Sequence, residues 1–134
     1  MDTMTTTVEL AKTSTCVETL TLLASHKDWE VRENVAGNPS TPGRALRTIA
    51  VNEDGDYAWL ILRSVASNRN TTPKTLEILA YHRDYEVRAF VAGNTSTPAE
   101  TLTMLAEWSG GDIPEILYLN PSTPEAVRTI MGAY

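Results

Sequence analysis

One short turn recurs along the chain and constrains its fold more than any other feature. It reads "NPSTP" at residues 38–42, "NRNTTP" at 68–73, "NTSTP" at 94–98 and "NPSTP" again at 120–124. In a fifth, weaker copy Cys16 stands where the others have proline, and the five positions are 26, 31, 25 and 26 residues apart. Apolar patterns such as "LTLLA" and "LEILA" follow the turns, and a second apolar element then ends in asparagine. A period of this length is typical of stacked supersecondary units.

A longer match inside the chain indicates duplication. Residues 24–38 read "ASHKDWEVRENVAGN" and residues 80–94 read "AYHRDYEVRAFVAGN", with ten of the 15 positions identical. The two segments lie two repeats apart. The chain therefore repeats a whole structural unit, and not only its turn.

The residue types predict two helices in each unit. Threonine can accept hydrogen bonds from free first-turn amides, and the proline that follows needs no amide partner. Leu20, Leu23 and Ala24 share one helical face, as do their counterparts in the other units. Asp28 and Asp84 suit the start of a second helix, and the Gly-Asn pairs suit a left-handed stop. The threonines expected to cap first helices are Thr15, Thr41, Thr72, Thr97 and Thr123, with Glu18 and Glu100 completing two capping boxes.

These units predict an all-α fold, because one helix pair of about ten residues each cannot bury its apolar face alone. We expect a short right-handed α-solenoid of about four and a half two-helix repeats. Residues 14–134 would form this single domain. Residues 1–13 would be a polar segment, partly disordered or serving as a partial cap.

The pattern "VRxxVAxNpsTPxxxLxxLA" resembles the leucine-rich repeat variant family. The residues that carry it are Val31-Arg32, Val35-Ala36, 38–42, Leu46, Val87-Arg88, Val91-Ala92, 94–98, Leu102 and Leu105-Ala106. The resemblance implies a HEAT-like solenoid whose second helices are short and 3₁₀-like, and an interaction scaffold without catalytic activity. Some members hold an iron–sulfur cluster in a cysteine-rich segment, which this chain lacks, so no cofactor is carried over.

Composition narrows the function classes. The formal charge is −6 and the sequence pI about 4.8, which disfavours nucleic acid as a partner. The single cysteine, Cys16, cannot form an internal disulfide and suits a reducing cytoplasm. We expect no signal peptide, membrane span, metal site or cofactor. No nucleophile, base and orienting group are placed together, so we expect no enzyme.

Candidate partner-binding residues are aromatic or arginine, the types enriched in interface hot spots. Trp29, Trp59 and Tyr85 fall at one aligned position, which also suits packing between repeats. The arginines also suit helix salt bridges, such as Asp28 with Arg32 and Asp84 with Arg88. The enlarged loop "NEDGD" at 52–56 is a further contact candidate. The seven residues singled out are Trp29, Arg32, Trp59, Arg63, Tyr85, Arg88 and Trp108.

The sequence thus predicts a non-catalytic, cytoplasmic protein–protein interaction module. It would act as an adaptor, or as an inhibitor that occludes a partner's surface, through its curved face and variable loops. The alternative is a nucleic-acid-binding HEAT-like protein. An uncapped solenoid end also leaves open a homodimer, because Val127, Ile130 and Met131 have no following repeat to cover them.

Overall fold

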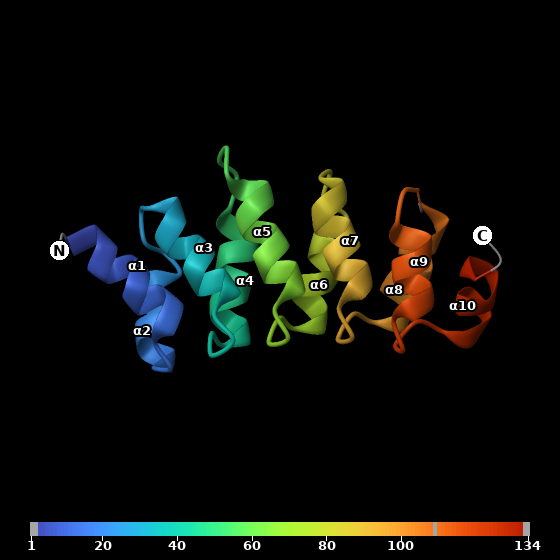
Figure 1. Ribbon diagram of the computed structural model, residues 1–134, viewed down its shortest axis with the longest axis horizontal. Helices are drawn as coiled ribbons and strands as arrows, with labels where there is room; N and C mark the ends of the chain where they lie inside the picture. Colours follow the sequence, from blue (N-terminus) through green and yellow to red (C-terminus); the bar gives the residue numbers. More distant parts are fainter. Residues whose placement is uncertain (1–2, 109, 133–134) are drawn as a thin grey trace.

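The computed structural model describes residues 3–108 and 110–132 of the chain. Over this part the chain forms ten α-helices and no β-strand, which confirms the all-α prediction (Figure 1). In chain order they are α1 (Thr3–Thr13), α2 (Val17–Leu23), α3 (Trp29–Gly37), α4 (Gly43–Asn52), α5 (Ala58–Ser67), α6 (Pro73–Leu79), α7 (Tyr85–Gly93), α8 (Ala99–Glu107), α9 (Ile113–Leu119) and α10 (Glu125–Met131).

The helices form two rows along an elongated molecule. One row consists of α1, α3, α5, α7 and α9, and each of these helices packs against the next (Figure 1). The other row holds α2, α4, α6, α8 and α10, which touch one another more sparsely. The described residues from α2 onward therefore make four two-helix repeats and one further helix, the solenoid that the sequence predicts.

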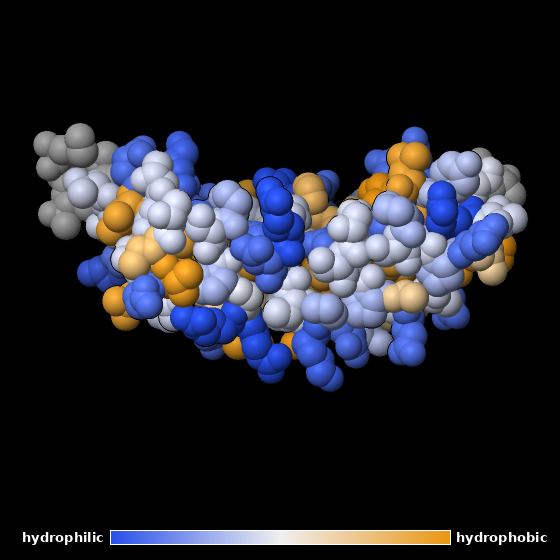
Figure 2. Space-filling view, turned by 90° about the horizontal axis from the view of Figure 1, so that it is seen from below, coloured by the Kyte–Doolittle hydropathy of each residue, from blue (hydrophilic) through white to orange (hydrophobic). Residues whose placement is uncertain are grey.

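The rod is bent along its length. Figure 2 looks at the edge that carries the turns after the second helices, and one long side of the molecule is hollowed in this view. The more closely packed row, α3, α5, α7 and α9, lies on this inner side. The inner face of the solenoid is therefore made by second helices.

Aliphatic side chains at recurring positions join the two rows. Each such residue is at most 2 % exposed, and burying it contributes about 1.5–3 kcal/mol relative to leaving it in water. The core is continuous from repeat to repeat because each helix pair covers the next. The first helices contribute Leu20, Leu46, Leu76 and Leu102, and the second helices contribute Val31, Ile61, Val87 and Ile113.

The second helices are α-helices of seven to ten residues, and not the 3₁₀-like turns that the family resemblance implies. Two of them begin as the sequence predicts. The Asp28 carboxylate accepts a hydrogen bond from the Glu30 amide at 2.8 Å, and the Asp84 carboxylate accepts one from the Val87 amide at 3.2 Å. These aspartates are the N-caps of α3 and α7.

The turn threonines act differently from the prediction. Thr41 and Thr97 are buried, and each hydroxyl donates to the carbonyl six residues earlier, at Val35 and Val91, at 2.6 and 2.7 Å. Pro42, Pro98 and Pro124 occupy the N-cap positions instead, without a side-chain bond. These two hydroxyls therefore tie their turns back to the helix before, whereas the buried hydroxyl of Thr123, also predicted as a cap, has no hydrogen-bond partner among the described residues.

The two remaining turns differ in detail. The turn at 68–73 has one extra residue, so Thr71 takes the buried role and bonds Val65 at 2.6 Å. Thr72 is then free to cap α6 as predicted, by accepting from the Thr75 amide. At the start of α2 the N-cap is Cys16, and not Thr15, and neither predicted capping box forms.

The second helices end at buried asparagines, and not at Gly-Asn pairs with left-handed backbone as the sequence predicts. Each second helix ends at an asparagine with extended backbone, and among the described residues only Gly111 has a positive φ. The Asn38 amide group donates to three carbonyls of the segment before it, and each of the other three amide groups donates to two carbonyls of the preceding repeat. For Asn94 these belong to Ala66 and Asn68, at 2.8 and 3.2 Å. We call this set, Asn38, Asn68, Asn94 and Asn120, the asparagine ladder.

The helix α1 lies where the second helix of an earlier repeat would be. Ala11 of α1 is fully buried, and the Asn38 amide donates to the Ala11 carbonyl at 2.9 Å. The contact between α1 and α3 thus repeats the one that later second helices make with each other.

Candidate functional site

Two of the aligned aromatic residues, Trp29 and Tyr85, are partly buried and pack against the core. Trp29 packs against the core and stacks on Tyr57, with ring centroids 4.2 Å apart and an interplanar angle of 17°. Tyr57 is the last residue of the loop between α4 and α5, so this stacking links two repeats. Trp29 therefore packs between repeats, which is the alternative to partner binding that its aligned position also suits. The loop that ends at Tyr57 has five residues, like the loops at 24–28 and 80–84, so it is not enlarged as the sequence predicts; the additional residues lengthen α4 and α5 instead.

Tyr85 has a defined internal role. Its hydroxyl donates to the Gly110 carbonyl at 3.1 Å and accepts from the amides of Asp112 and Ile113 at 2.6 and 3.2 Å. It therefore caps the start of α9. Gly111 has a φ of 54°, and a β-carbon there would come within 2.5 Å of the Tyr85 hydroxyl. Glycine is required at this point of the loop.

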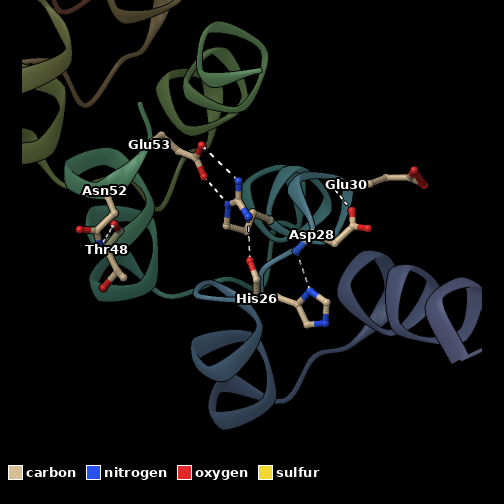
Figure 3. A network of polar contacts seen from close by, with 7 residues as sticks. His26, Asp28, Glu30, Thr48, Asn52 and Glu53 are labelled. Atoms are coloured by element: carbon tan, nitrogen blue, oxygen red, sulfur yellow. Dashed lines mark hydrogen bonds and ion pairs between the residues drawn. The ribbon is translucent and has the colours of Figure 1, made fainter. Parts of the chain in front are cut away.

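Arg32 and Arg88 are also engaged within the chain, although not with the predicted aspartates. A guanidinium nitrogen of Arg32 donates to the His26 carbonyl at 2.7 Å, and the group forms an ion pair with Glu53. Figure 3 shows Glu53 and His26 converging on this group. Arg88 donates to the His82 carbonyl at 2.8 Å. Each arginine therefore fastens the loop between a first and a second helix.

The aligned histidines complete these loops. Nδ1 of His26 accepts from the Asp28 amide at 3.0 Å (Figure 3), and Nδ1 of His82 accepts from the Asp84 amide at 3.0 Å. Partial burial lowers the pKa of His82, Asp84 opposes this shift, and the charges of Arg83 and Arg88 add to it.

We expect the stability of the protein to fall as pH is lowered, in part through His82. The unfolded chain has a histidine pKa of about 6.5, so it takes up a proton before the folded chain does. The stabilisation that neutral His82 gives the folded protein is fully present above the unfolded pKa. It is lost as pH falls through the lower pKa of the folded protein. Urea denaturation of wild type and His82→Gln at pH 7.5 and 5.0 checks this. The variant should lose less stability than wild type, and equal losses would contradict the assignment.

Trp59, Arg63 and Phe90 form a group on the inner row, which we call the Trp59 cluster; Arg63 is half-buried between two exposed rings. Trp59 and Phe90 are 42 % and 38 % exposed. The Arg63 guanidinium carbon lies 5.4 Å from the Trp59 ring centroid and 5.9 Å from that of Phe90. Within the part of the chain that the structure describes, Arg63 forms no ion pair with a carboxylate. Sequence reasoning identified Trp59 and Arg63 but missed Phe90, which lies one repeat later.

Trp108 stands apart from these residues. It ends α8, is 51 % exposed, and meets the 64 %-exposed ring of Tyr81 edge-on at 5.5 Å. The seven candidates thus divide into Trp29, Arg32, Tyr85 and Arg88, which have internal roles, and Trp59, Arg63 and Trp108, which present exposed surface.

A groove lies next to the Trp59 cluster, between α7 and α9, with a volume of about 460 Å³. Ala89, Phe90 and Ile116 contribute its apolar lining, and Glu86 and Asp112 contribute carboxylates. Of its lining residues, only Tyr85 is among the site residues that the sequence predicts. The signal of the groove is the apolar pair Phe90 and Ile116, at positions where the earlier second helices carry Asn34 and Ser64.

Comparison with known proteins supports the repeat assignment. The family model described as leucine rich repeat variant matches residues 29–54, which run from the start of α3 into the loop after α4. The predicted resemblance is confirmed for this segment. Comparison with curated proteins gives no match, and neither does comparison with solved structures. The family match suggests a repeat-based protein interaction module, and helical solenoids of this kind are typically non-catalytic.

Two further findings concern other site types. Within residues 3–108 and 110–132, no helix combines the length and the apolar character that crossing a membrane requires. No three His, Cys, Asp or Glu side chains of these residues are grouped so as to hold a metal ion.

Proposed function

We propose that this chain binds another protein through the inner face of the solenoid and its variable loops, without catalysing a reaction. It would serve as an adaptor, or as an inhibitor that covers a partner's surface. The observation that carries the proposal is the Trp59 cluster, an arginine held between two exposed aromatic rings on the inner row.

The composition of this cluster suits a binding anchor. Tryptophan and arginine are the types most enriched among interface residues whose truncation costs 2 kcal/mol or more. Both rings keep a large accessible area, and the guanidinium retains donors for a partner's carbonyl or carboxylate. A partner that covers the cluster would also remove water from the arginine and strengthen its contact with the rings.

The loops are the second part of the proposed surface. The loop that precedes α5 carries exposed Asp54 and Asp56, and Trp108 lies beside the loop that precedes α9. Both loops are on the edge opposite the turns that follow the second helices (Figure 1). Long loops on a rigid scaffold often carry function.

Truncation of Trp59 and Arg63, two residues of the Trp59 cluster, is expected to weaken partner binding strongly. We expect the double variant Trp59→Ala with Arg63→Ala to bind a partner captured from lysate of the source organism about 30-fold more weakly, the equivalent of a 2 kcal/mol hot spot. Affinity is measured by titration of the identified partner. The variant should keep its helical circular dichroism, because both residues lie outside the buried core.

Leu22→Ala is the matched control. Leu22 is 78 % exposed on α2, in the other row, so its truncation should leave affinity unchanged. Trp108→Ala tests the loop beside α9 separately. A partner that binds the double variant as tightly as wild type would contradict the assignment of the inner face.

Two further experiments test the alternative functions that the sequence leaves open. A single-stranded RNA probe that bound with steep salt dependence would favour nucleic-acid binding. Light scattering across a range of concentrations reports self-association, for which Ile130 on α10, 56 % exposed, is the proposed contact. The single cysteine supports the cytoplasm as the proposed compartment.

A further inference from the structure

The groove between α7 and α9 has the form of a site for one protruding side chain. Its volume of about 460 Å³ lies in the range of ligand sites, about 300–1,000 Å³. Ala89 and Phe90 line it from α7, and Ile116 lines it from α9. Phe90 also belongs to the Trp59 cluster, so the groove continues the surface proposed for partner binding.

Gly93 keeps this groove open, and the fold does not require a glycine there. Gly93 is the last residue of α7 and its φ is not positive. A β-carbon would meet only Ile116 Cγ2, at 3.5 Å, which is an ordinary contact. Glycine in a helix costs up to about 1 kcal/mol relative to alanine. Absence of a side chain also lets a ligand approach the backbone closely.

The charged side chains that line the groove are acidic. Glu86 and Asp112 are exposed carboxylates that line it, and among the described residues no lysine or arginine does. The guanidinium groups of Arg63 and Arg88 lie outside this lining, over two of its aromatic rings, at 5.9 and 5.8 Å from the ring centroids. The whole chain carries a formal charge of −6. A ligand with a positive charge beside its apolar group therefore matches the groove, whereas an acidic one is repelled.

We propose that this groove receives a large apolar side chain from a segment of another protein, and that a neighbouring lysine or arginine of that segment pairs with Glu86 and Asp112. The inference rests on the proposed function and specifies the chemistry of the partner. The apolar side chain packs on Phe90 and Ile116 beside Gly93. The basic residue sets the orientation of the segment along the groove.

Selection of phage-displayed random dodecapeptides on the wild-type chain tests this proposal. We expect enriched sequences to carry Leu, Phe, Met or Trp next to Lys or Arg. Synthetic peptides of those sequences, labelled with fluorescein, are then titrated by fluorescence anisotropy. Gly93→Leu, which fills the groove, should weaken binding at least tenfold, and Glu86→Gln should weaken it and reduce its dependence on salt.

The duplicated segment supplies matched controls. Gly37 and Glu30 occupy in α3 the positions of Gly93 and Glu86 in α7, and a β-carbon at Gly37 would meet nothing within 4 Å. Gly37→Leu and Glu30→Gln should therefore leave binding unchanged. Circular dichroism and thermal unfolding verify that all four variants stay folded.

Failure of the groove proposal can be distinguished from failure of the proposed function. Enrichment of acidic peptides, or of peptides without an apolar anchor, would overturn the groove proposal. Peptides that bind Gly93→Leu as tightly as wild type, but lose affinity for the double variant Trp59→Ala with Arg63→Ala, would also overturn the groove proposal. In that case the proposed function would stand. A selection that enriches nothing would also overturn the groove, and the lysate experiment would then decide the proposed function separately.

Discussion

Asn68→Ala is expected to lower the free energy of unfolding by about 3 kcal/mol, since an unsatisfied buried polar group costs about 1–3 kcal/mol and the Ala36 carbonyl and the Asn70 amide lose their partner. The Asn38 carbonyl keeps the Thr41 amide as a donor, at 3.1 Å. The Asn68 side chain is 7 % exposed. Its amide donates to the carbonyls of Ala36 and Asn38 at 2.9 and 3.0 Å, and its oxygen accepts from the Asn70 amide at 2.9 Å. Alanine can replace none of these bonds. Urea denaturation followed by circular dichroism measures the loss.

Asn52→Ala is the control for this prediction. The Asn52 amide donates to the Thr48 carbonyl at 2.9 Å on the exposed end of α4 (Figure 3), where water can take over the bond. We expect its stability to change by less than about 0.5 kcal/mol. Similar losses for the two variants would mean that the asparagine ladder contributes no more than a surface contact.

Tyr85→Phe is expected to cost about 2 kcal/mol, because it removes three hydrogen bonds at a partly exposed site and keeps the ring. The main consequence should be local. The amides of Asp112 and Ile113 lose their acceptor, so the start of α9 is held less firmly. Hydrogen exchange should accelerate at residues 112 and 113, while the amides of α3 and α5 change only with global stability.

The control for the tyrosine is Tyr81→Phe. Tyr81 is 64 % exposed and its ring meets Trp108, a contact that phenylalanine retains. We expect neither stability nor exchange at residues 112 and 113 to change. Unaltered exchange in Tyr85→Phe would show that the loop before α9 is held by its backbone alone.

The arrangement of helices could be predicted from the sequence because apolar residues recur at fixed positions in each unit. Leu46, Leu76 and Leu102 are buried at the same place in successive first helices, as the periodicity indicates. The duplicated segment predicts that Val31 and Val87 are equivalent, and both are fully buried. Such positions depend on local periodicity, which one sequence contains.

The roles of the short polar residues could not be predicted in the same way. Threonine and asparagine suit local capping, but Thr41 bonds a carbonyl six residues earlier and Asn68 bonds carbonyls 30 and 32 residues earlier. Their partners depend on how neighbouring repeats stack. Arg32 pairs with Glu53, 21 residues away, in the loop of the next repeat.

The candidate site shows the same limit. Aromatic and arginine residues identify Trp59 and Arg63 as surface anchors, because their types alone favour interfaces. The groove needs Phe90 and Ile116 on adjacent helices and an empty place at Gly93 between them. It forms where α7 packs beside α9, and local sequence patterns do not predict how neighbouring helices pack.

The asparagine ladder also determines how the molecule can flex. Its amide groups fix the spacing of successive repeats at the edge where the second helices end. The opposite edge carries the loops between first and second helices, and the row of first helices is loosely joined. We therefore expect the rod to bend mainly where the first helices separate, while the asparagine edge keeps its spacing, and a partner bound across several first helices would set the curvature.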